Sequence, residues 1–281
     1  MDRGHEIEAA LIVYADAPQT VEQRLAELRK LSAFRLRHRD AETIEDTYFD
    51  TTDRSLQARL IALRIRRLGG TSLLTMKADS HPALAGEDRL EIESDLSPSV
   101  LHNVMSELRN RGVGMPASPG ELGSADSSTV MASLGLEEVQ TRVTRRIPRD
   151  VVARGPETQP LAELAIDDVT YRFRDGRVRL LEVEVEAKGK GDACTVEQVT
   201  ASLQAAFPSQ LRPWPYGKLP TGKAIQELLA DGKLDGLISE DRILRPAAYE
   251  QIARFLDRGA MSQSREVSPS SPRSKTAGMR S

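Results

Sequence analysis

The sequence has little of several residue types, and each shortage excludes a class of protein. It contains a single cysteine, Cys194, which excludes an internal disulfide bond and a thiolate metal site, and which suits a reducing compartment. Aromatic residues make up only 4% of the chain, too few for a surface that stacks nucleic-acid bases. No apolar run is long enough to span a membrane, and residues 1–10 lack the apolar core of a signal peptide. We therefore expect a cytoplasmic protein that binds neither a membrane nor nucleic acid.

Charge is abundant but balanced. The chain has 39 lysine and arginine residues against 42 aspartate and glutamate residues, which gives a formal net charge of −3. Such a balance produces no global basic field that would attract nucleic acid or a membrane surface. With 39% hydrophobic residues, the 281-residue chain can form the core of one large domain or of two small ones. What distinguishes this sequence is therefore where its charges lie.

Charged residues alternate with aliphatic residues in short runs along the chain. In residues 180–186, Glu182, Glu184 and Glu186 alternate with leucine and valine, so a β-strand here places the acids on one face. Taken alone, this pattern is typical of an outer strand whose acids face water. Similar runs, some with acids and some with arginines, predict further strands. The expected strands cover residues 5–13, 43–51, 60–67, 72–78, 89–93, 138–147, 161–173 and 178–187.

Capping signals place helices between these strands. Ser97 predicts a helix that ends near residue 111, and Thr20, Thr195 and Thr221 are expected to cap helices that end near residues 31, 207 and 232. The predicted domain covers residues 1–235, with a loop insertion at about 113–129 that is rich in proline, glycine and serine. A helical extension is expected at 236–258, and residues 259–281 should be disordered. Several strands follow one another through turns too short for a parallel crossover, so we predict a single α+β domain.

The charged faces of the expected strands suggest one shared interior. Their acids are Glu6, Glu8, Glu91, Glu93, Glu163, Asp167, Glu182, Glu184 and Glu186, and their bases are Arg64, Arg66, Lys77, Arg89 and one of Arg145 or Arg146. If the sheet closes into a barrel, the capped helices need its apolar face, which leaves the charges inside. Buried ions must pair with each other or with a charged ligand. Carboxylates suit magnesium, and arginine or lysine suits phosphate, so a metal–polyphosphate would satisfy both sets.

Short motifs occur along the chain in the order found in the CYTH superfamily of triphosphate tunnel metalloenzymes, which the sequence resembles over about residues 6–229. The matching stretches are Glu6-x-Glu8, residues 48–51, residues 62–66, residues 75–77, Arg89-x-Glu91, Arg145-Arg146, residues 165–167, Glu182-x-Glu184-x-Glu186 and Lys218. That superfamily includes thiamine triphosphatases, inorganic triphosphatases and one class of adenylate cyclase. The resemblance implies an α+β fold in which a single eight-stranded antiparallel β-barrel, the triphosphate tunnel, is flanked by helices.

The resemblance also implies roles for particular residues. Glu6 and Glu8 would be the catalytic residues that orient the attacking water. The ligands of a Mg²⁺ or Mn²⁺ ion would be Glu6, Glu8, Asp167, Glu182 and Glu184. The phosphates would be bound by Arg64, Arg66, Lys77, Arg89, Arg145 and Lys218. Arg146 remains the alternative to Arg145, because neighbouring residues face opposite sides of a strand and the register can shift by one.

One position departs from the family pattern and leaves the function open between hypotheses. The opening motif of the family is Glu-x-Glu-x-Lys, and this chain has Ala10 at the lysine position, with Lys218 or Lys223 as candidates to supply the missing charge. The first hypothesis is metal-dependent hydrolysis of a triphosphate-bearing small molecule: inorganic tripolyphosphate, a nucleoside triphosphate or thiamine triphosphate. A non-catalytic sensor of triphosphates or nucleotides is the second, supported by Ala10, and an adenylate cyclase is the third. The oligomeric state stays open, with a homodimer among the options.

Two other stretches invite a functional interpretation but have a simpler one. Residues 217–224 nearly match a phosphate-binding P-loop, but Ala224 stands where the magnesium-binding hydroxyl belongs, so a helix capped by Thr221 explains them better. The basic residues within 35–39 could extend a substrate groove, although a solvated loop is the simpler interpretation.

Overall fold

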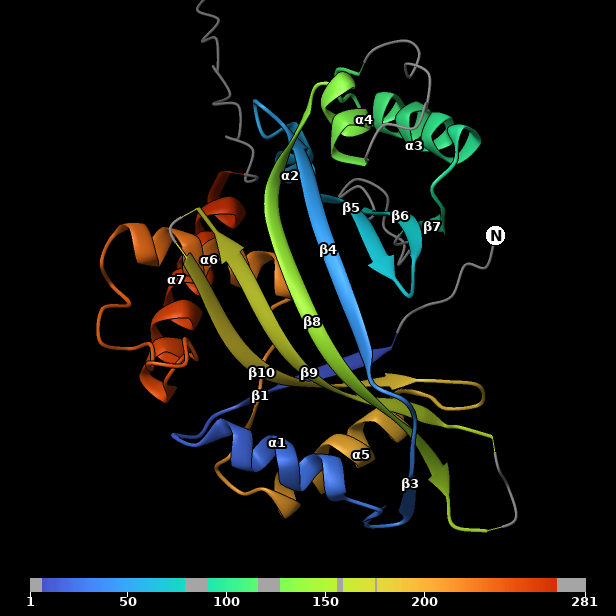
Figure 1. Cartoon of the computed structure of the whole chain (residues 1–281), viewed down its shortest axis with the longest axis vertical. Helices are drawn as coiled ribbons and strands as arrows, with labels where there is room; N and C mark the ends of the chain where they lie inside the picture. The colour runs from blue at the N-terminus through green and yellow to red at the C-terminus, as the bar shows by residue number, and fades with distance from the viewer. Residues whose placement is uncertain (1–6, 79–89, 116–126, 156–158, 175, 267–281) are drawn as a thin grey trace, which may run out of the picture.

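The computed structural model describes residues 7–78, 90–115, 127–155, 159–174 and 176–266 (Figure 1). One sheet runs through the molecule, and its strands pair antiparallel, as predicted. In the described residues it has eleven strands. They are β1 (Glu8–Val13), β2 (Lys30–Leu31), β3 (Phe34–His38), β4 (Glu42–Thr51), β5 (Ile61–Leu68), β6 (Thr71–Ala78), β7 (Leu90–Asp95), β8 (Leu136–Ala153), β9 (Ala162–Phe173), β10 (Gly176–Ala187) and β11 (Leu211–Pro213).

The helices lie in three groups around the sheet (Figure 1). They are α1 (Pro18–Glu27), α2 (Ser55–Ala58), α3 (Pro98–Asn110), α4 (Ser127–Ser133), α5 (Ala193–Ala206), α6 (Lys218–Ala230) and α7 (Pro246–Glu266). The last helix continues beyond the predicted end of the helical extension at 258. Among the residues described, no helix is long and apolar enough to cross a membrane.

The predicted closed, eight-stranded barrel is wrong, because the sheet is open. Its strands follow the order β11-β1-β10-β9-β8-β4-β5-β6-β7, so β11 and β7 form two separate edges in the described part of the chain. Closure would require β7 to pair with β1. Instead, β1 pairs with β10 on one side and, through Leu11–Val13, with β11 on the other. The short strand β11, which the alternation pattern does not predict, therefore takes the edge that closure needs.

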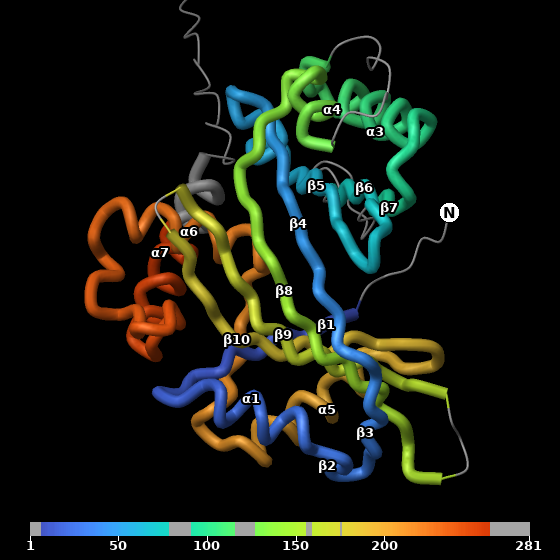
Figure 2. The backbone as a smooth tube through the Cα atoms, viewed as in Figure 1, coloured from blue at the N-terminus to red at the C-terminus, as the bar shows by residue number. Residues whose placement is uncertain are grey.

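Most aliphatic residues of the sheet lie on one face, here called the outer face. Two groups of helices cover this face (Figure 2). Helices α1 and α5 pack on β8, β9 and β10, where residues such as Leu164 and Val183 are fully buried. Helices α2, α3 and α4 pack on β4, β5 and β6, where Leu63 and Leu74 belong to the buried cluster. Because side chains alternate along a strand, the neighbours of these residues point to the opposite, inner face. Alternation predicted that helices cover the apolar face of the sheet and that the charged residues lie on the opposite face. These two groups of helices and the charged inner face agree with that prediction.

Helices α6 and α7 lie instead against one end of the inner face. Their core includes Tyr171 and Leu180, which share a face with the acids of β9 and β10 by register. The approach is close at Gly222, where an added Cβ would lie 2.4 Å from Gln140 Nε2 and 2.5 Å from the Tyr171 ring. Gly222 therefore lets α6 sit directly on the inner ends of β8 and β9.

Three of the four predicted caps differ from the observed helix starts. Ser97 caps α3 as predicted, accepting a hydrogen bond from the backbone of Val100. Helix α5 is capped by Asp192, whose carboxylate accepts from Thr195, so the capping box begins before the expected cap. Helices α1 and α6 begin at Pro18 and Lys218 without a side-chain cap. Thr221, the expected cap of α6, lies inside that helix and accepts from the Trp214 indole.

Candidate active site

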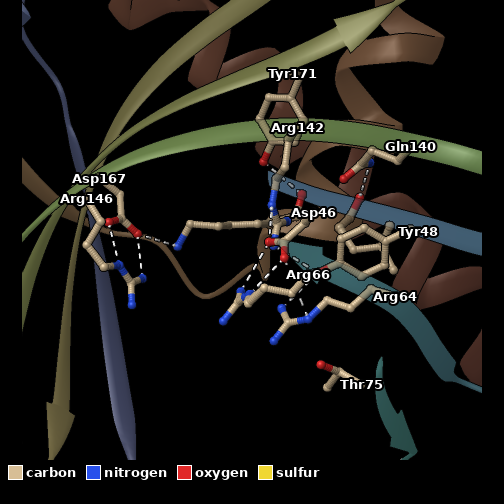
Figure 3. A network of polar contacts seen from close by, with 12 residues as sticks. Asp46, Tyr48, Arg64, Arg66, Thr75, Gln140, Arg142, Arg146, Asp167 and Tyr171 are labelled. Atoms are coloured by element: carbon tan, nitrogen blue, oxygen red, sulfur yellow. Dashed lines mark hydrogen bonds and ion pairs between the residues drawn. The ribbon is translucent and has the colours of Figure 1, made fainter. Parts of the chain in front are cut away.

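The inner face brings together two clusters of charged side chains (Figure 3). Strand register places Arg142 of β8 opposite Asp46 of β4, and Asp46 opposite Arg66 of β5. The same register places Arg146 opposite Asp167. Two residues of β8 that are four positions apart share a face and lie roughly 13 Å apart along the strand. The arginine cluster around Asp46 and the acidic cluster around Asp167 are therefore neighbours on one continuous surface.

Asp46 is the hub of the arginine cluster. It is 1% exposed and accepts hydrogen bonds from Arg66 Nε at 2.8 Å and from Arg142 Nη2 at 2.8 Å. A third guanidinium, that of Arg64, lies 3.9 Å away. Burial alone would raise the pKa of Asp46, but the three arginines hold that pKa well below its usual range. One carboxylate thus holds three guanidinium groups in place, and a second, that of Glu93, lies 3.5 Å from Arg64 Nη2, so the cluster keeps an excess of positive charge.

Tyr48 ties two of these arginines together. Its hydroxyl lies 2.9 Å from Arg142 Nη2 and 3.3 Å from Arg64 Nη1, and both guanidinium groups donate to it. Burial opposes ionisation of the phenol, but Arg142 and Arg64 lower its pKa below the ordinary value. Two further donors, Arg64 Nε and Arg142 Nη1, are buried and have no hydrogen-bond acceptor within the described residues. Buried, unpaired guanidinium donors are costly, and an anionic ligand is the group that would satisfy them.

The acidic cluster is built around the ammonium of Lys218, the first residue of α6. Its Nζ lies 3.2 Å from Asp167 Oδ2 and 3.5 Å from Glu182 Oε1, and it bonds to Glu184 Oε1. Arg146 donates to Asp167 at 2.7 Å and to Glu184 at 2.6 Å. The α6 backbone is held there by Tyr171, whose hydroxyl donates to the Lys218 carbonyl at 2.8 Å.

The pKa values of the two glutamates of this cluster shift in opposite directions. Burial, together with nearby Glu184 and Asp167, raises the pKa of Glu182 although Lys218 opposes the shift. The pKa of Glu184 is lowered despite burial, because Lys218 and Arg146 both contact its carboxylate. Three acids against one lysine and one arginine leave an excess of negative charge beside the arginine cluster.

These acids fit a divalent metal in donor type. Carboxylate oxygens are the ligands that Mg²⁺ and Mn²⁺ prefer. Burial first, and then the nearby carboxylates of Glu184 and Asp167, raise the pKa of Glu182. As the described side chains stand, no group of three or more acids, histidines and cysteines is arranged to hold a metal ion, because Lys218 takes the shared centre. The residues that would hold a metal are Glu182, Glu184 and Asp167, whose carboxylates now contact Lys218.

The structure brings most of the residues predicted for the site onto the inner face. Arg64, Arg66, Asp167, Glu182, Glu184 and Lys218 belong to the two clusters. Further along the same face, Lys77 forms an ion pair with Glu91 at 3.0 Å, and Glu8 lies opposite Glu186 at an exposed position. Glu6 and Arg89 lie outside the described residues.

The register places Arg145 and Arg146 on opposite faces of β8. Arg145, the predicted phosphate-binding residue, lies on the outer face, where its half-exposed side chain pairs with Glu22 of α1. Arg146 takes the inner position, opposite Asp167. Lys223, one of two candidates to replace the missing family lysine, donates to Gln57 of α2 instead. Lys218, the other candidate, contacts the glutamate that faces Ala10 across the strand pair.

Two central residues, Asp46 and Arg142, were absent from the set predicted for the site. Arg142 was recoverable in principle, because it shares strand parity with Arg146 and lies in the same expected strand. Asp46 sits in a run that combines acid, hydroxyl and aromatic residues without clear alternation, so its direction could not be assigned from the sequence.

Comparisons of the sequence with known proteins found a family and a relative. The CYTH domain family matches residues 15–207. The chain is 29% identical over 161 residues to the thiamine-triphosphatase of Homo sapiens, a match that covers 57% of this chain and 62% of that protein. It thus spans less than two thirds of the length of this relative.

Solved structures of similar fold have lower sequence identity. An adenylate cyclase candidate from Bacillus halodurans is 18% identical, with a TM-score of 0.44 over 76% of this chain and 95% of that one. An adenylyl cyclase candidate from Hippeastrum, described as having a dominant triphosphatase activity, is 18% identical, with a TM-score of 0.46 over 78% and 96%. The family match alone spans more than half of the chain, from just before α1 through α5, and includes most of the charged inner face. This chain belongs to the CYTH domain family.

Proposed function

We propose that the protein hydrolyses the triphosphate group of a small-molecule substrate on the inner face of its sheet, with a divalent metal ion. The observation that carries the proposal is the pair of buried, unpaired donors, Arg64 Nε and Arg142 Nη1, beside a carboxylate cluster. Guanidinium groups bind phosphate oxygens in matched pairs, and hard carboxylate oxygens bind magnesium or manganese. A metal–triphosphate uses both sets at once. The family match and the triphosphatase named among the relatives support the same reaction class.

The residues of the arginine cluster would act by holding charge in place. Arg64, Arg66 and Arg142 are fixed by Asp46 and Tyr48 before a ligand arrives, so little reorganisation is needed when phosphate oxygens become more negative in the transition state. Asp46 and Glu93 together offset two of the three positive charges and leave the third for the ligand. These side chains bind and orient the phosphates and stabilise the oxygen that leaves.

The acidic cluster would hold the metal, with Glu182, Glu184 and Asp167 as candidate ligands and Glu8 on the adjacent strand. A divalent ion bound there supplies Lewis-acid polarisation of the phosphate oxygens. Lys218 and Arg146 orient these carboxylates and lower the cost of gathering them. Glu8, exposed on the same face, would accept a hydrogen bond from the attacking water.

Binding without turnover is the second candidate function, and one position favours it. Ala10 faces Glu184 on the inner side, so the strand that carries Glu8 contributes a methyl group where the family pattern has a lysine. If Lys218 cannot replace that charge during the reaction, the site would bind a triphosphate and keep it intact. Adenylate cyclisation remains the third candidate, because relatives with that description share the fold.

The test is phosphate release from tripolyphosphate, thiamine triphosphate and ATP, with magnesium, with manganese and with a chelator. Wild type should release phosphate only with metal. Arg142→Met should lower the rate on the order of 10²-fold, the usual effect of removing one donor to a developing charge. Arg177→Met, an exposed change on the hairpin between β9 and β10, serves as the matched control and should retain the rate.

The outcomes separate the candidates. Triphosphate-induced thermal stabilisation without phosphate release would support the binding function. Pyrophosphate and cyclic nucleotide from ATP, in place of phosphate, would support the cyclase. Metal-independent release, or release unaffected by Arg142→Met, would contradict the proposed site.

A further inference from the structure

Strand β3 brings a histidine next to an arginine of β8 on the outer face of the sheet. The expectation of a solvated loop at residues 35–39 is wrong, because β3 runs through His38 and pairs with the far end of β8. Phe34 and Leu36 pack into the outer core, so by alternation His38 also lies on the outer face. Across the strand pair, His38 is opposite Arg149. These two basic side chains are therefore neighbours on the side of the sheet that is otherwise apolar.

Arg149 is a buried arginine that has no acidic partner among the described side chains. Only 5% of the residue is exposed, and its strand neighbours are Leu164 of β9 and His38 of β3. Its Nε is fully buried and has no hydrogen-bond acceptor in the part of the chain that the structure describes. The neighbouring charge that acts on it is that of Arg29, which is also positive.

Two other arginines of β8 show what Arg149 lacks. Arg145, four residues earlier on the same face, forms an ion pair with Glu22 of α1. Arg146, on the opposite face, forms one with Asp167 at 2.7 Å. In both cases a neighbouring element supplies the carboxylate that a half-buried or buried guanidinium needs. No described element supplies one to Arg149.

The surroundings of Arg149 therefore make its charge unfavourable. Burial lowers the pKa of its guanidinium, and Arg29 lowers that pKa further. Arg29 lies just before β2, and its carbonyl accepts a hydrogen bond from the backbone of Leu36, which places it at the side of β3 next to the end of α1 (Figure 2). A guanidinium stays protonated in a protein, so the charge is present and needs an anion. Buried charges in proteins are paired or bind a charged ligand.

The terminal nitrogens of Arg149 are accessible to such a ligand. Nη1 and Nη2 form no hydrogen bond with described residues, but unlike Nε they are not fully enclosed. The side chains of Arg29 and His38 are exposed beside them. A guanidinium edge binds an oxyanion through two parallel hydrogen bonds, and a second arginine adds charge from the side. A small oxyanion meets both requirements.

We propose that Arg149 and Arg29, with His38 beside them, form a binding site for a small oxyanion such as inorganic phosphate on the outer face of the sheet. This site is separate from the candidate active site. Arg149 and Arg146 lie on opposite faces of β8 and roughly 10 Å apart along the strand. An anion at Arg149 therefore does not compete with a ligand on the inner face, and its binding requires no catalysis there.

The first measurement is the melting temperature as a function of phosphate concentration, at an ionic strength kept constant with sodium chloride. The variant is Arg149→Met, and the exposed Arg177→Met is the matched control. At a phosphate concentration ten times the Kd, the rise in wild type and in the control should exceed the rise in Arg149→Met by about 3–6 °C. Phosphate that binds to the arginine cluster on the inner face contributes equally to all three proteins and cancels in this difference.

The same variant reports whether Arg149 has a structural role. Without phosphate, Arg149→Met should melt at the temperature of wild type or above it, because methionine removes an unpaired buried cation and keeps an apolar side chain of similar length. A clearly lower melting temperature would overturn the proposal, since it would show that the guanidinium has a partner within the protein.

A second measurement locates the anion. Phosphate should shift the imidazole proton signals of His38, assigned with His38→Gln, in wild type and in Arg177→Met but not in Arg149→Met. Sulfate should act as phosphate does, because it is also a tetrahedral oxyanion. Chloride at equal ionic strength should have no such effect.

Three results would overturn the proposal. Equal rises in melting temperature for wild type and Arg149→Met would mean that all phosphate binds elsewhere. Signals of His38 that do not move, or that move equally in Arg149→Met, would remove the anion from this position. An equal shift with chloride would show general screening of the basic side chains. Neither measurement involves hydrolysis, so each of these results leaves the proposed triphosphatase function standing.

Discussion

Asp46→Asn is the perturbation that tests the arginine cluster most directly. The substitution keeps the shape of the side chain and removes its charge. It leaves Arg142, whose side chain is 3% exposed, and the partly buried Arg66 and Arg64 without their shared carboxylate. Breaking a buried ion pair from one side costs about 3–5 kcal/mol, because the remaining charge stays buried without compensation. We expect a loss of that size in the free energy of unfolding at pH 7.

The pH dependence provides a second, independent signature. The folded-state pKa of Asp46 is depressed, so its stabilising contribution is present above the unfolded-state pKa of about 3.9 and is lost as pH falls through the folded-state value. Urea unfolding of wild type and variant should therefore give a constant difference from pH 8 to about pH 5. The difference should begin to shrink only below about pH 4.

A ligand should reverse part of the loss. Without Asp46, only the contact between Arg64 and Glu93 offsets the charges of the cluster. The variant therefore offers one more positive charge to a ligand, and tripolyphosphate should raise its melting temperature more than that of wild type. Asp231→Asn is the matched control, because Asp231 pairs with Lys233 at a position where both side chains are 53% exposed. Such a pair contributes about 0–1 kcal/mol. The reasoning is refuted if Asp46→Asn costs no more than Asp231→Asn, or if tripolyphosphate stabilises the variant less than wild type.

Two further predictions concern the helix that covers the inner face. Lys218→Met should lower the free energy of unfolding by about 3–5 kcal/mol, because it leaves buried carboxylates without their cation. The variant should be more stable at pH 5 than at pH 8, because losing Lys218 raises the folded-state pKa of Glu182 still further, and such a group opposes folding increasingly as pH rises. Lys233→Met is the surface control, and a flat pH profile of the variant in urea unfolding would contradict this account of the acidic cluster. Gly222→Ala should cost about 1–3 kcal/mol although alanine favours helices, because its Cβ would overlap the Gln140 amide, and a neutral or stabilising effect on melting temperature would show that α6 is not closely packed there.

Alternation was sufficient to predict which side of the sheet carries charge. Glu182 and Glu184 on β10, and Arg64 and Arg66 on β5, face inward because their aliphatic neighbours are needed by the helices outside. The period of two is a local property of each strand, so it can be read from a few residues. It carries no information about which strands meet, and for that reason neither the open sheet nor the pairing of β1 with β11 could be predicted.

The same limit explains the difference between the predicted and the observed clusters. Arg145 and Arg146 are adjacent, and a shift of one residue in register exchanges them. Only the pairing of β8 with β9 decides that Arg146 meets Asp167. Asp46 gains its importance from two strands that lie on either side of it, β5 and β8, and the second is far away in sequence. A residue whose role comes entirely from long-range pairing gives no local signal.

The position of Ala10 connects the packing of α6 to the charge of the site. Strand β1 brings no cation to Glu184, and the ammonium that reaches this carboxylate comes from Lys218, at the first turn of α6. That turn is held by the Tyr171 hydroxyl and by the close approach at Gly222. The position of the Lys218 ammonium therefore depends on the position of α6. In a protein with a lysine on β1, the sheet itself would supply the charge. Here a helix packed across the inner face supplies it, and displacement of α6 should therefore weaken ligand binding before it unfolds the sheet.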